Sequence, residues 1–223
     1  MEKMYEDEIK NMYDDPAVAE RFADQEQNPD HQQVAAIVDD IIALETAGFV
    51  HPLRIAELGG GAHTDRYDRL FEKLLPEPGR GRIDWVDASA SMIELADEYL
   101  EDDRYQTRNQ VITFVHKDML AYLESMEDCT LDCAIMKYTL NYLSDNEIEL
   151  LFQLLKRKLK TPGRLITTVS SPSGVLQSHN QHARFIYRGE EIPLGETRKL
   201  GNWKDLYTTD SSARDLFVMV LRK

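Results

Sequence analysis

Short apolar runs alternate with amphipathic segments through most of this chain, and this alternation constrains the fold more than any other feature. Five runs are predicted to be strands, at residues 53–58, 82–87, 111–116, 131–136 and 164–169. Strands that alternate with helices form a largely parallel sheet with helices on both faces. The sequence therefore predicts a doubly wound α/β fold.

Helix signals fall between these runs. Helices are predicted over residues 65–75, from residue 89 to about residue 100, over residues 119–125 and from residue 144 to about residue 160. Ser89 is a candidate helix cap, and Ser144 with Glu147 has the spacing of a capping box. Thr161, Pro162 and Gly163 are expected to end the last of these helices.

The two ends of the chain follow other patterns. Residues 16–22 and 31–47 are predicted to be helical, whereas beyond residue 170 the pattern weakens to a possible strand at 183–188 and a strong final strand at 216–221. With no long helix before it, the final strand is expected at an antiparallel edge. A length of 223 residues suits one domain with its own core, so we expect a single domain over residues 1–223.

The charge is acidic and uneven. The formal net charge is -14, yet residues 151–223 carry 13 basic and 6 acidic side chains. An acidic surface repels phosphate backbones, so we expect no nucleic-acid partner. The basic run at residues 156–160 is interpreted as the solvated end of a helix, where positive charge suits the helix dipole.

The termini and cysteines suggest a cytoplasmic protein. The first eight residues are acidic with no apolar run behind them, and no stretch approaches a membrane span, so neither a targeting segment nor a membrane partner is expected. Cys129 and Cys133 have no histidine nearby, which favours buried or half-buried free thiols and predicts no metal site.

Glycines and acids follow the predicted strands where those strands end. Glu57 and Gly59–Gly61 close the first, Asp87 closes the second and Asp118 follows the third. Ligands of open parallel sheets bind beyond the carboxyl ends of the strands, near the point where strand order reverses. Gly59 and Gly61 would allow a positive φ and a close backbone approach to such a ligand.

This series resembles the class I S-adenosylmethionine-dependent methyltransferases over about residues 53–169. The family pattern is an acid followed by Gly-x-Gly, then Asp-x-Ser-x-x-Met at the end of the second strand. The matching residues are Glu57, Gly59, Gly61, Asp87, Ser89 and Met92. The resemblance implies a Rossmann-like sheet of six or seven strands, S-adenosylmethionine as cofactor with S-adenosylhomocysteine as product, and methyl transfer by in-line displacement.

The resemblance also assigns roles. Asp87 would accept hydrogen bonds from the ribose hydroxyls and Asp118 one from the adenine amino group, while Glu57 would fix the glycine loop or meet the cofactor's amino group indirectly. A tight turn, a helix cap and core packing remain the alternatives for such residues. The predicted cofactor-binding set is Glu57, Gly59, Gly60, Gly61, Asp87, Ala88, Met92, Asp118, Met119 and Lys137.

No catalytic residue is predicted with a defined role. His63 replaces a glycine common in the family loop and is a candidate base, although a lone loop histidine is often a surface or capping residue. Tyr138, at the mouth of the fourth strand, is a candidate to face the acceptor. Transfer of an activated methyl group depends mainly on holding the acceptor close and aligned, so no fixed triad is required.

The acceptor is expected to be a small molecule. The Asn/Asp-Pro-Pro-aromatic signature of amino-directed DNA and glutamine methyltransferases is absent, since Lys137-Tyr138-Thr139-Leu140 stands in its place. Residues 1–50 are expected to form a helical cap, with Tyr5, Tyr13 and Phe22 as candidate lid aromatics. Residues 51–170 would be the cofactor-binding core, and residues 171–223 would supply strands that complete the sheet.

Two other functions remain open. A non-catalytic protein that binds S-adenosylmethionine or S-adenosylhomocysteine as a regulatory or partner subunit would use the same core. An NAD-dependent oxidoreductase shares the strand-turn-helix logic, but its Gly-x-Gly-x-x-Gly would need a glycine where the chain has Thr64. The sequence does not indicate an oligomeric state.

Overall fold

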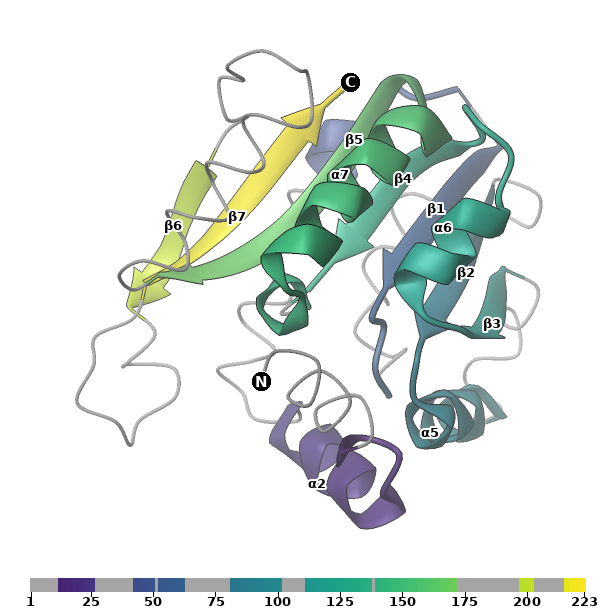
Figure 1. Ribbon diagram of the computed structural model, residues 1–223, viewed down its shortest axis with the longest axis vertical. Helices are drawn as coiled ribbons and strands as arrows, with labels where there is room; N and C mark the ends of the chain where they lie inside the picture. The colour runs from purple at the N-terminus through teal and green to yellow at the C-terminus, as the bar shows by residue number, and fades with distance from the viewer. Residues whose placement is uncertain are drawn as a thin grey trace.

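The computed structural model describes residues 12–26, 42–50, 52–62, 81–101, 111–137, 139–171, 197–202 and 215–223. Within these ranges one sheet has seven strands in the order β3-β2-β1-β4-β5-β7-β6 (Figure 1). The strands are β1 (Leu53–Leu58), β2 (Gly81–Asp87), β3 (Ile112–His116), β4 (Leu131–Met136), β5 (Leu159–Ser171), β6 (Thr197–Asn202) and β7 (Asp215–Arg222). β1 to β5 run parallel, which confirms the predicted doubly wound fold.

The last two strands extend the sheet differently from the prediction. β7 is antiparallel to β5, as expected, but β6 pairs with its other side, so the C-terminal strand is not an edge strand. An interior position suits the unbroken apolar run 216–221. β6 itself, Thr-Arg-Lys-Leu-Gly-Asn, lacks apolar alternation and was not predicted. The strand predicted at residues 183–188 lies outside the described residues.

Helices cover the sheet and border the carboxyl ends of its parallel strands, which point toward α2 and α5 in Figure 1. They are α2 (Pro16–Glu26), α5 (Ala90–Glu101), α6 (Met119–Ser125), the 3₁₀ helix η3 (Leu140–Tyr142) and α7 (Asp145–Lys158), with a further helical turn at residues 42–46. The helix predicted at 65–75 and most of the one at 31–47 lie outside the described residues. No helix among the described ranges is long and apolar enough to cross a membrane.

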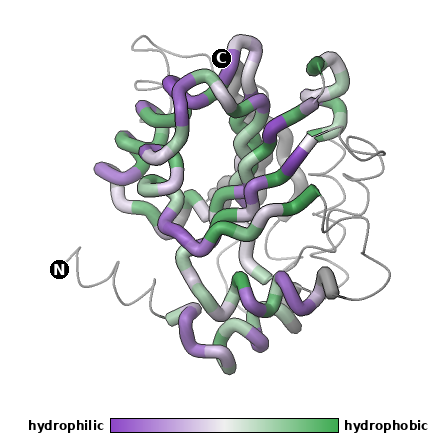
Figure 2. Tube along the Cα trace, turned by 90° about the vertical axis from the view of Figure 1, so that its right-hand side faces the viewer, coloured by the Kyte–Doolittle hydropathy of each residue, from purple (hydrophilic) through white to green (hydrophobic). Residues whose placement is uncertain are grey.

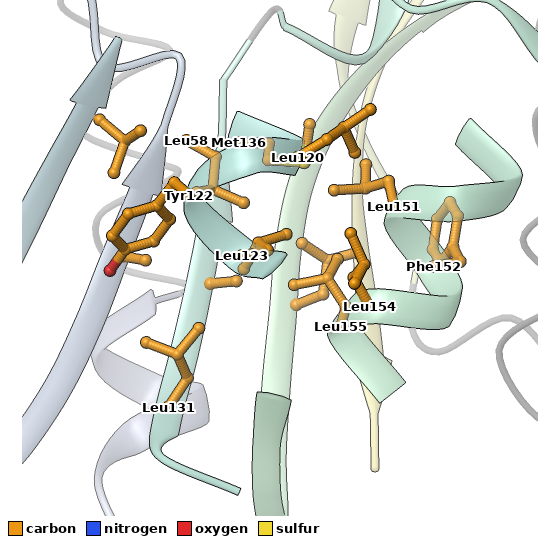
Figure 3. Close-up of a cluster of buried hydrophobic side chains, with 14 of the residues drawn as sticks. Leu58, Leu120, Tyr122, Leu123, Leu131, Met136, Leu151, Phe152, Leu154 and Leu155 are labelled. Atoms are coloured by element: carbon orange, nitrogen blue, oxygen red, sulfur yellow. The ribbon is translucent and has the colours of Figure 1, made fainter. Parts of the chain in front are cut away.

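The core lies between the sheet and the pair α6 and α7. The apolar stripe of α7 is fully buried there: Ile148, Leu151, Phe152 and Leu155 are all at 0% exposure. Figure 3 shows Leu151 and Leu155 of α7 on the side of that helix toward Leu120 and Leu123 of α6. In the tube view, hydrophilic and hydrophobic residues alternate along the helices at the lower edge of the molecule (Figure 2).

The start of α7 agrees with the sequence, and its end does not. Ser144 and Glu147 form the predicted capping box. The helix stops at Lys158, because Leu159 already pairs with Leu131 as the first residue of β5. The basic run is therefore only partly solvated: Lys158 is 2% exposed, with its Nζ donating to the Met126 carbonyl at 2.6 Å and to Asp128 at 2.8 Å.

The two cysteines differ in environment. Both are free thiols, and Cys133 is buried as expected, within strand β4. Cys129 is exposed, against the prediction, in a turn where it has a φ of 55°. Burial raises the pKa of the Cys133 thiol well above its usual range, so this cysteine behaves as a small apolar residue of the core.

Candidate active site

A pocket opens where β3, β2, β1 and β4 end, on both sides of the point at which strand order reverses. Nine of the ten residues predicted to bind a cofactor line it: Gly59, Gly60, Gly61, Asp87, Ala88, Met92, Asp118, Met119 and Lys137. They come from four separate stretches of sequence. The topology thus brings together residues that the sequence only placed at separate strand ends.

The glycine loop after β1 is fastened to the end of β2. The Gly59 and Gly60 amides donate to the Val86 carbonyl at 2.8 and 3.0 Å, and the buried Trp85 indole donates to the Gly61 carbonyl at 2.9 Å. A Cβ at position 60 would lie 2.2 Å from the Trp85 Nε1, so that glycine is required by packing. The shape of the loop is therefore set by its contacts with β2.

Gly61 has a different reason to be glycine. Its φ is +66°, in the left-handed region that favours glycine, as the sequence predicted. A Cβ there would meet nothing within 4 Å, and the residue lines the pocket. The backbone at Gly61 thus borders open space in the pocket.

Asp87 connects the glycine loop to the helix after β2. One carboxylate oxygen accepts the Gly61 N–H at 2.9 Å, and the other accepts the Ser89 N–H at 2.8 Å. Burial raises the pKa of Asp87 above its usual value, the hydrogen bonds from Ser89, Gly61 and Ala88 oppose this, and the negative charge of Asp14 adds to the increase. A carboxylate has about four acceptor positions, so capacity remains for a ligand hydroxyl.

Asp118 has a structural role in addition to its place in the pocket. Its Oδ1 accepts from the amides of Leu120 and Ala121 at 2.9 and 3.2 Å, which caps the N-terminus of α6. Asp118 is therefore a helix cap, which was one of the alternatives for this residue. It also lines the pocket, beside Met119. The cap holds the carboxyl group in a fixed orientation.

Two ionisable side chains lie buried at the ends of the central strands. Lys137, 5% exposed, follows β4 and lines the pocket. Glu57, at 0% exposure, lies in β1 two residues before Gly59. It is the one residue of the predicted cofactor-binding set that does not line the pocket.

The segment comprising residues 12–26, here called the N-terminal segment, covers one side of the pocket with Tyr13 and Phe22. It is attached to the start of α5: Ser89 Oγ donates to the Tyr13 carbonyl at 2.7 Å, Ser91 Oγ donates to the Asp14 carbonyl at 2.9 Å, and the Ala90 amide donates to Asp14 Oδ1 at 3.1 Å. Tyr13 and Phe22 thus occupy the position predicted for lid aromatics. Tyr5 lies outside the described residues.

The sequence reasoning missed one wall of the pocket. Thr139, Tyr142 and Leu143 line it from the stretch that follows β4, and the Tyr142 hydroxyl lies 3.1 Å from that of Tyr13. Lys117, after β3, also borders the pocket. The two catalytic candidates, His63 and Tyr138, lie outside the described residues.

Comparison with known proteins gives one family and many related folds. Residues 59–163 match the model of a family described as a methyltransferase domain. No curated protein matches the chain. The matched range begins at the glycine loop and ends at the turn before Arg164, so it contains the stretches after β1, β2, β3 and β4 that line the pocket.

Three solved structures illustrate the similarity of fold. Magnesium protoporphyrin IX methyltransferase from Synechocystis PCC 6803, solved with bound S-adenosylmethionine, has a TM-score of 0.65 at 15% identity, with 97% of this chain and 96% of that chain covered. A TehB-like methyltransferase from Corynebacterium glutamicum has a TM-score of 0.61 at 16% identity, covering 94% and 100%.

Geranyl diphosphate C-methyltransferase from Streptomyces coelicolor has a TM-score of 0.60 at 11% identity, covering 87% of this chain and 82% of that chain. At such identities the solved structures show a similar fold and no more. The methyltransferase-domain match is independent of them, because it is a match of the amino-acid sequence. The family match over residues 59–163 and the Rossmann-like fold agree with the resemblance of the sequence to the class I S-adenosylmethionine-dependent methyltransferases.

Proposed function

We propose that this protein transfers a methyl group from S-adenosylmethionine to a small-molecule acceptor, with the cofactor held in the pocket at the ends of β1 to β4. The observation that carries the proposal is Asp87: a partly buried carboxylate at the end of β2, fixed by backbone N–H groups of Gly61 and Ser89 and bordering the pocket. An acid in this position of a Rossmann-like sheet binds ribose hydroxyls.

The residues present fit the cofactor. Gly61 leaves open space where its own Cβ would be, and the remaining acceptor capacity of Asp87 suits a ribose hydroxyl. Met92 and Met119 offer polarizable apolar contacts to an adenine ring, and Asp118 a carboxyl group for the adenine amino group. Lys137, buried at the end of β4, would attract the cofactor's carboxylate.

Bound there, S-adenosylmethionine would supply a methyl group on positively charged sulfur. The lone pair of an acceptor would bond to the methyl carbon in line with the carbon–sulfur bond, which would break and release S-adenosylhomocysteine. The tasks left to the protein are to align the acceptor, to exclude water and to let the acceptor lose its proton. The N-terminal segment and the stretch after β4 would perform the first two tasks, since they cover the pocket with Tyr13, Phe22 and Tyr142. His63 remains a candidate base for the third task, and Tyr138 remains a candidate to face the acceptor.

A small-molecule acceptor is supported by the acidity of the chain and by the relatives of similar fold. The net charge of -14 disfavours a nucleic-acid acceptor. Two relatives are named for small molecules, magnesium protoporphyrin IX and geranyl diphosphate. A cytoplasmic location, a single domain and the division into cap, core and completing strands at residues 1–50, 51–170 and 171–223 also remain proposals.

Calorimetric titration with S-adenosylmethionine, S-adenosylhomocysteine and NAD in parallel tests the proposal. We expect binding of the first two and none of NAD. We expect the Asp87→Asn variant to bind both more weakly, whereas Asp97→Asn, at an exposed aspartate of α5, should keep the wild-type affinity. Binding of NAD alone, or of no nucleotide, would refute the proposal. Cofactor binding without methyl transfer to any member of a broad acceptor screen would favour the non-catalytic alternative.

A further inference from the structure

The residues that line the pocket follow the order of the strands in the sheet. Those of the stretch after β4 have no cofactor role under the proposed function. From β3 to β4 the lining changes from Asp118 and Met119, through Asp87 and the glycine loop, to the stretch after β4. The first parts correspond to the proposed adenine, ribose and methionine positions. The part after β4, together with the N-terminal segment, is therefore where an acceptor would lie.

Three aromatic rings meet at this part of the pocket. The Tyr13 and Tyr142 rings are edge to face, with centroids 6.1 Å apart and an interplanar angle of 81°. The Phe22 ring is also edge to face with Tyr13, at 5.3 Å and 78°. Edge-to-face contact is the favoured arrangement of aromatic groups, and a further ring can join it.

The two tyrosines also meet through their hydroxyl groups. The oxygens are 3.1 Å apart, and either can be the donor. Tyr142 is 40% exposed, so the contact lies at the solvent-facing side, where a ligand can replace one partner. A tyrosine hydroxyl can both donate and accept, so it can pair with a hydroxyl or an amino group, whereas a quaternary ammonium group offers neither a donor nor an acceptor.

The charge of the residues that line this part of the pocket further limits which acceptors can bind there. Its described lining residues, Tyr13, Phe22, Thr139, Tyr142 and Leu143, carry no charged side chain. The cation that precedes them, Lys137, is assigned to the cofactor under the proposed function. An acceptor with a net charge would lose its hydration here without an opposite charge to replace it.

Each tyrosine is held independently of the other. Tyr13 is fixed through its own carbonyl, which accepts from Ser89 Oγ at 2.7 Å. Tyr142 ends η3, and its amide donates to the Thr139 carbonyl at 3.0 Å. Separation of the two hydroxyls by a ligand would therefore leave both backbones anchored.

We infer that Tyr13 and Tyr142 are acceptor-positioning residues, and that the acceptor is an uncharged aromatic compound that carries a hydroxyl or amino group. The inference rests on the proposed function. The rings of the two tyrosines hold the ring of the acceptor, and one of their hydroxyl groups binds its polar group.

The test measures ligand binding to protein saturated with S-adenosylhomocysteine, by saturation-transfer NMR and titration. The probes are phenol and aniline, with benzoate as the anionic aromatic and cyclohexanol as the non-aromatic alcohol. We expect phenol and aniline to bind more tightly than either of the other two. Preference for benzoate or equal binding of cyclohexanol would overturn the inference.

Matched variants locate the probe. Tyr142→Ala is expected to weaken phenol binding about tenfold, and Tyr142→Phe or Tyr13→Phe by about fivefold, from the loss of an aromatic pair or of one hydrogen bond. Tyr99→Phe, on α5 and not among the pocket residues, is the control and should bind phenol like the wild type. Equal loss in the control, or no loss in the others, would refute the assignment.

Titration with S-adenosylhomocysteine separates this inference from the proposed function. The tyrosine variants should bind S-adenosylhomocysteine with wild-type affinity, which also shows that they fold. If the wild type binds S-adenosylhomocysteine but not phenol or aniline, the inference fails alone. If the wild type does not bind S-adenosylhomocysteine, the proposed function fails, and the inference with it.

Discussion

Strand β2 carries two aspartates three positions apart whose surroundings differ completely. Asp84 accepts from the Arg54 guanidinium at 3.0 Å and from the Tyr122 hydroxyl at 2.5 Å, on the face covered by α6. Asp87 is held by backbone N–H groups of Gly61 and Ser89, at the end of the strand. One acid is bound by side chains, the other by the main chain.

The difference separates structural from functional acids. Asp84 accepts hydrogen bonds from the Arg54 guanidinium of β1 and the Tyr122 hydroxyl of α6, and thereby joins these two elements to β2. It does not line the pocket. The main-chain donors of Asp87 fix its position without neutralising its charge by a cation, and the carboxylate stays available to the pocket. Within the part of the chain that the structure describes, Asp87 has no cationic partner, and a partly buried acid of this kind at a pocket is a candidate for ligand binding.

The largest effect is expected for Asp84→Ala. Removal of the carboxylate breaks the ion pair with Arg54 and the hydrogen bond from Tyr122. Because Asp84 is buried and Arg54 is partly buried, we expect a loss of about 3 kcal/mol of unfolding free energy. Urea denaturation of the variant measures this loss. Its affinity for S-adenosylhomocysteine should stay within twofold of the wild type, about 0.4 kcal/mol. A large loss of affinity in a folded variant would abolish the contrast between the two acids.

A smaller loss of stability is expected for Tyr122→Phe. The variant lacks one hydrogen bond to a charged acceptor, which contributes about 2 kcal/mol. Burial, followed by the bond to Asp84, raises the pKa of Tyr122 above its ordinary 10.0, so the stability of the wild type should fall as the pH rises above 10. Denaturation curves on both sides of that pH should show this decline in the wild type and a weaker one in the variant.

For Asp87→Ala we expect a loss of ligand affinity rather than of stability. S-adenosylhomocysteine should bind at least about tenfold more weakly, or about 1.4 kcal/mol, because hydrogen bonds to a charged acceptor are lost. Calorimetry measures the affinity, and a melting curve serves as the control for folding. Unchanged affinity would remove Asp87 from the site.

The smallest expected effect concerns pH. Because burial raises the pKa of Asp87, its carboxylate takes up a proton at a higher pH than an ordinary aspartate of pKa 3.8, and S-adenosylhomocysteine affinity should decline as the pH falls through that raised value. The same raised pKa means that the contribution of Asp87 to stability is lost as the pH rises from 3.8 through the raised value. Asp87→Asn should bind weakly with little dependence on pH.

Asp14→Asn sharpens this test, because the negative charge of Asp14 contributes to the raised pKa of Asp87. Asparagine keeps an oxygen for the Ala90 amide, so the attachment to α5 is retained. The pH midpoint of the decline in affinity should move to a lower value than in the wild type. A midpoint that stays in place or rises would contradict the proposed effect of Asp14.

The sequence predicted the elements whose signals are local. β1 and β4 match their predicted bounds, and α6 matches over Met119–Ser125, since buried parallel strands form continuous apolar runs and Asp118 caps the helix between them. The pocket location followed from the rule that ligands bind beyond the carboxyl ends of parallel strands. Nine predicted residues line that pocket for this reason.

What escaped prediction depends on contacts between distant segments. Tyr142 lines the pocket beside Tyr13, which lies 129 residues earlier in the chain, and no local pattern indicates this contact. Gly60 is required by Trp85, and no local pattern links those two positions. The final strand is predicted at an edge because no long helix precedes it. Since β6 has no apolar alternation, its pairing with β7 could not be predicted from the sequence.

Ser89 limits how freely this enzyme can acquire new acceptors. Its amide holds Asp87, its hydroxyl accepts from the Met92 amide at 3.2 Å, and the same hydroxyl donates to the Tyr13 carbonyl. The N-terminal segment is thus joined to the very residue that organises the nucleotide end of the pocket. An exchange of this segment for that of a relative would succeed only if the donor segment brings a carbonyl to the same place, so cap and core are expected to change together rather than as interchangeable modules.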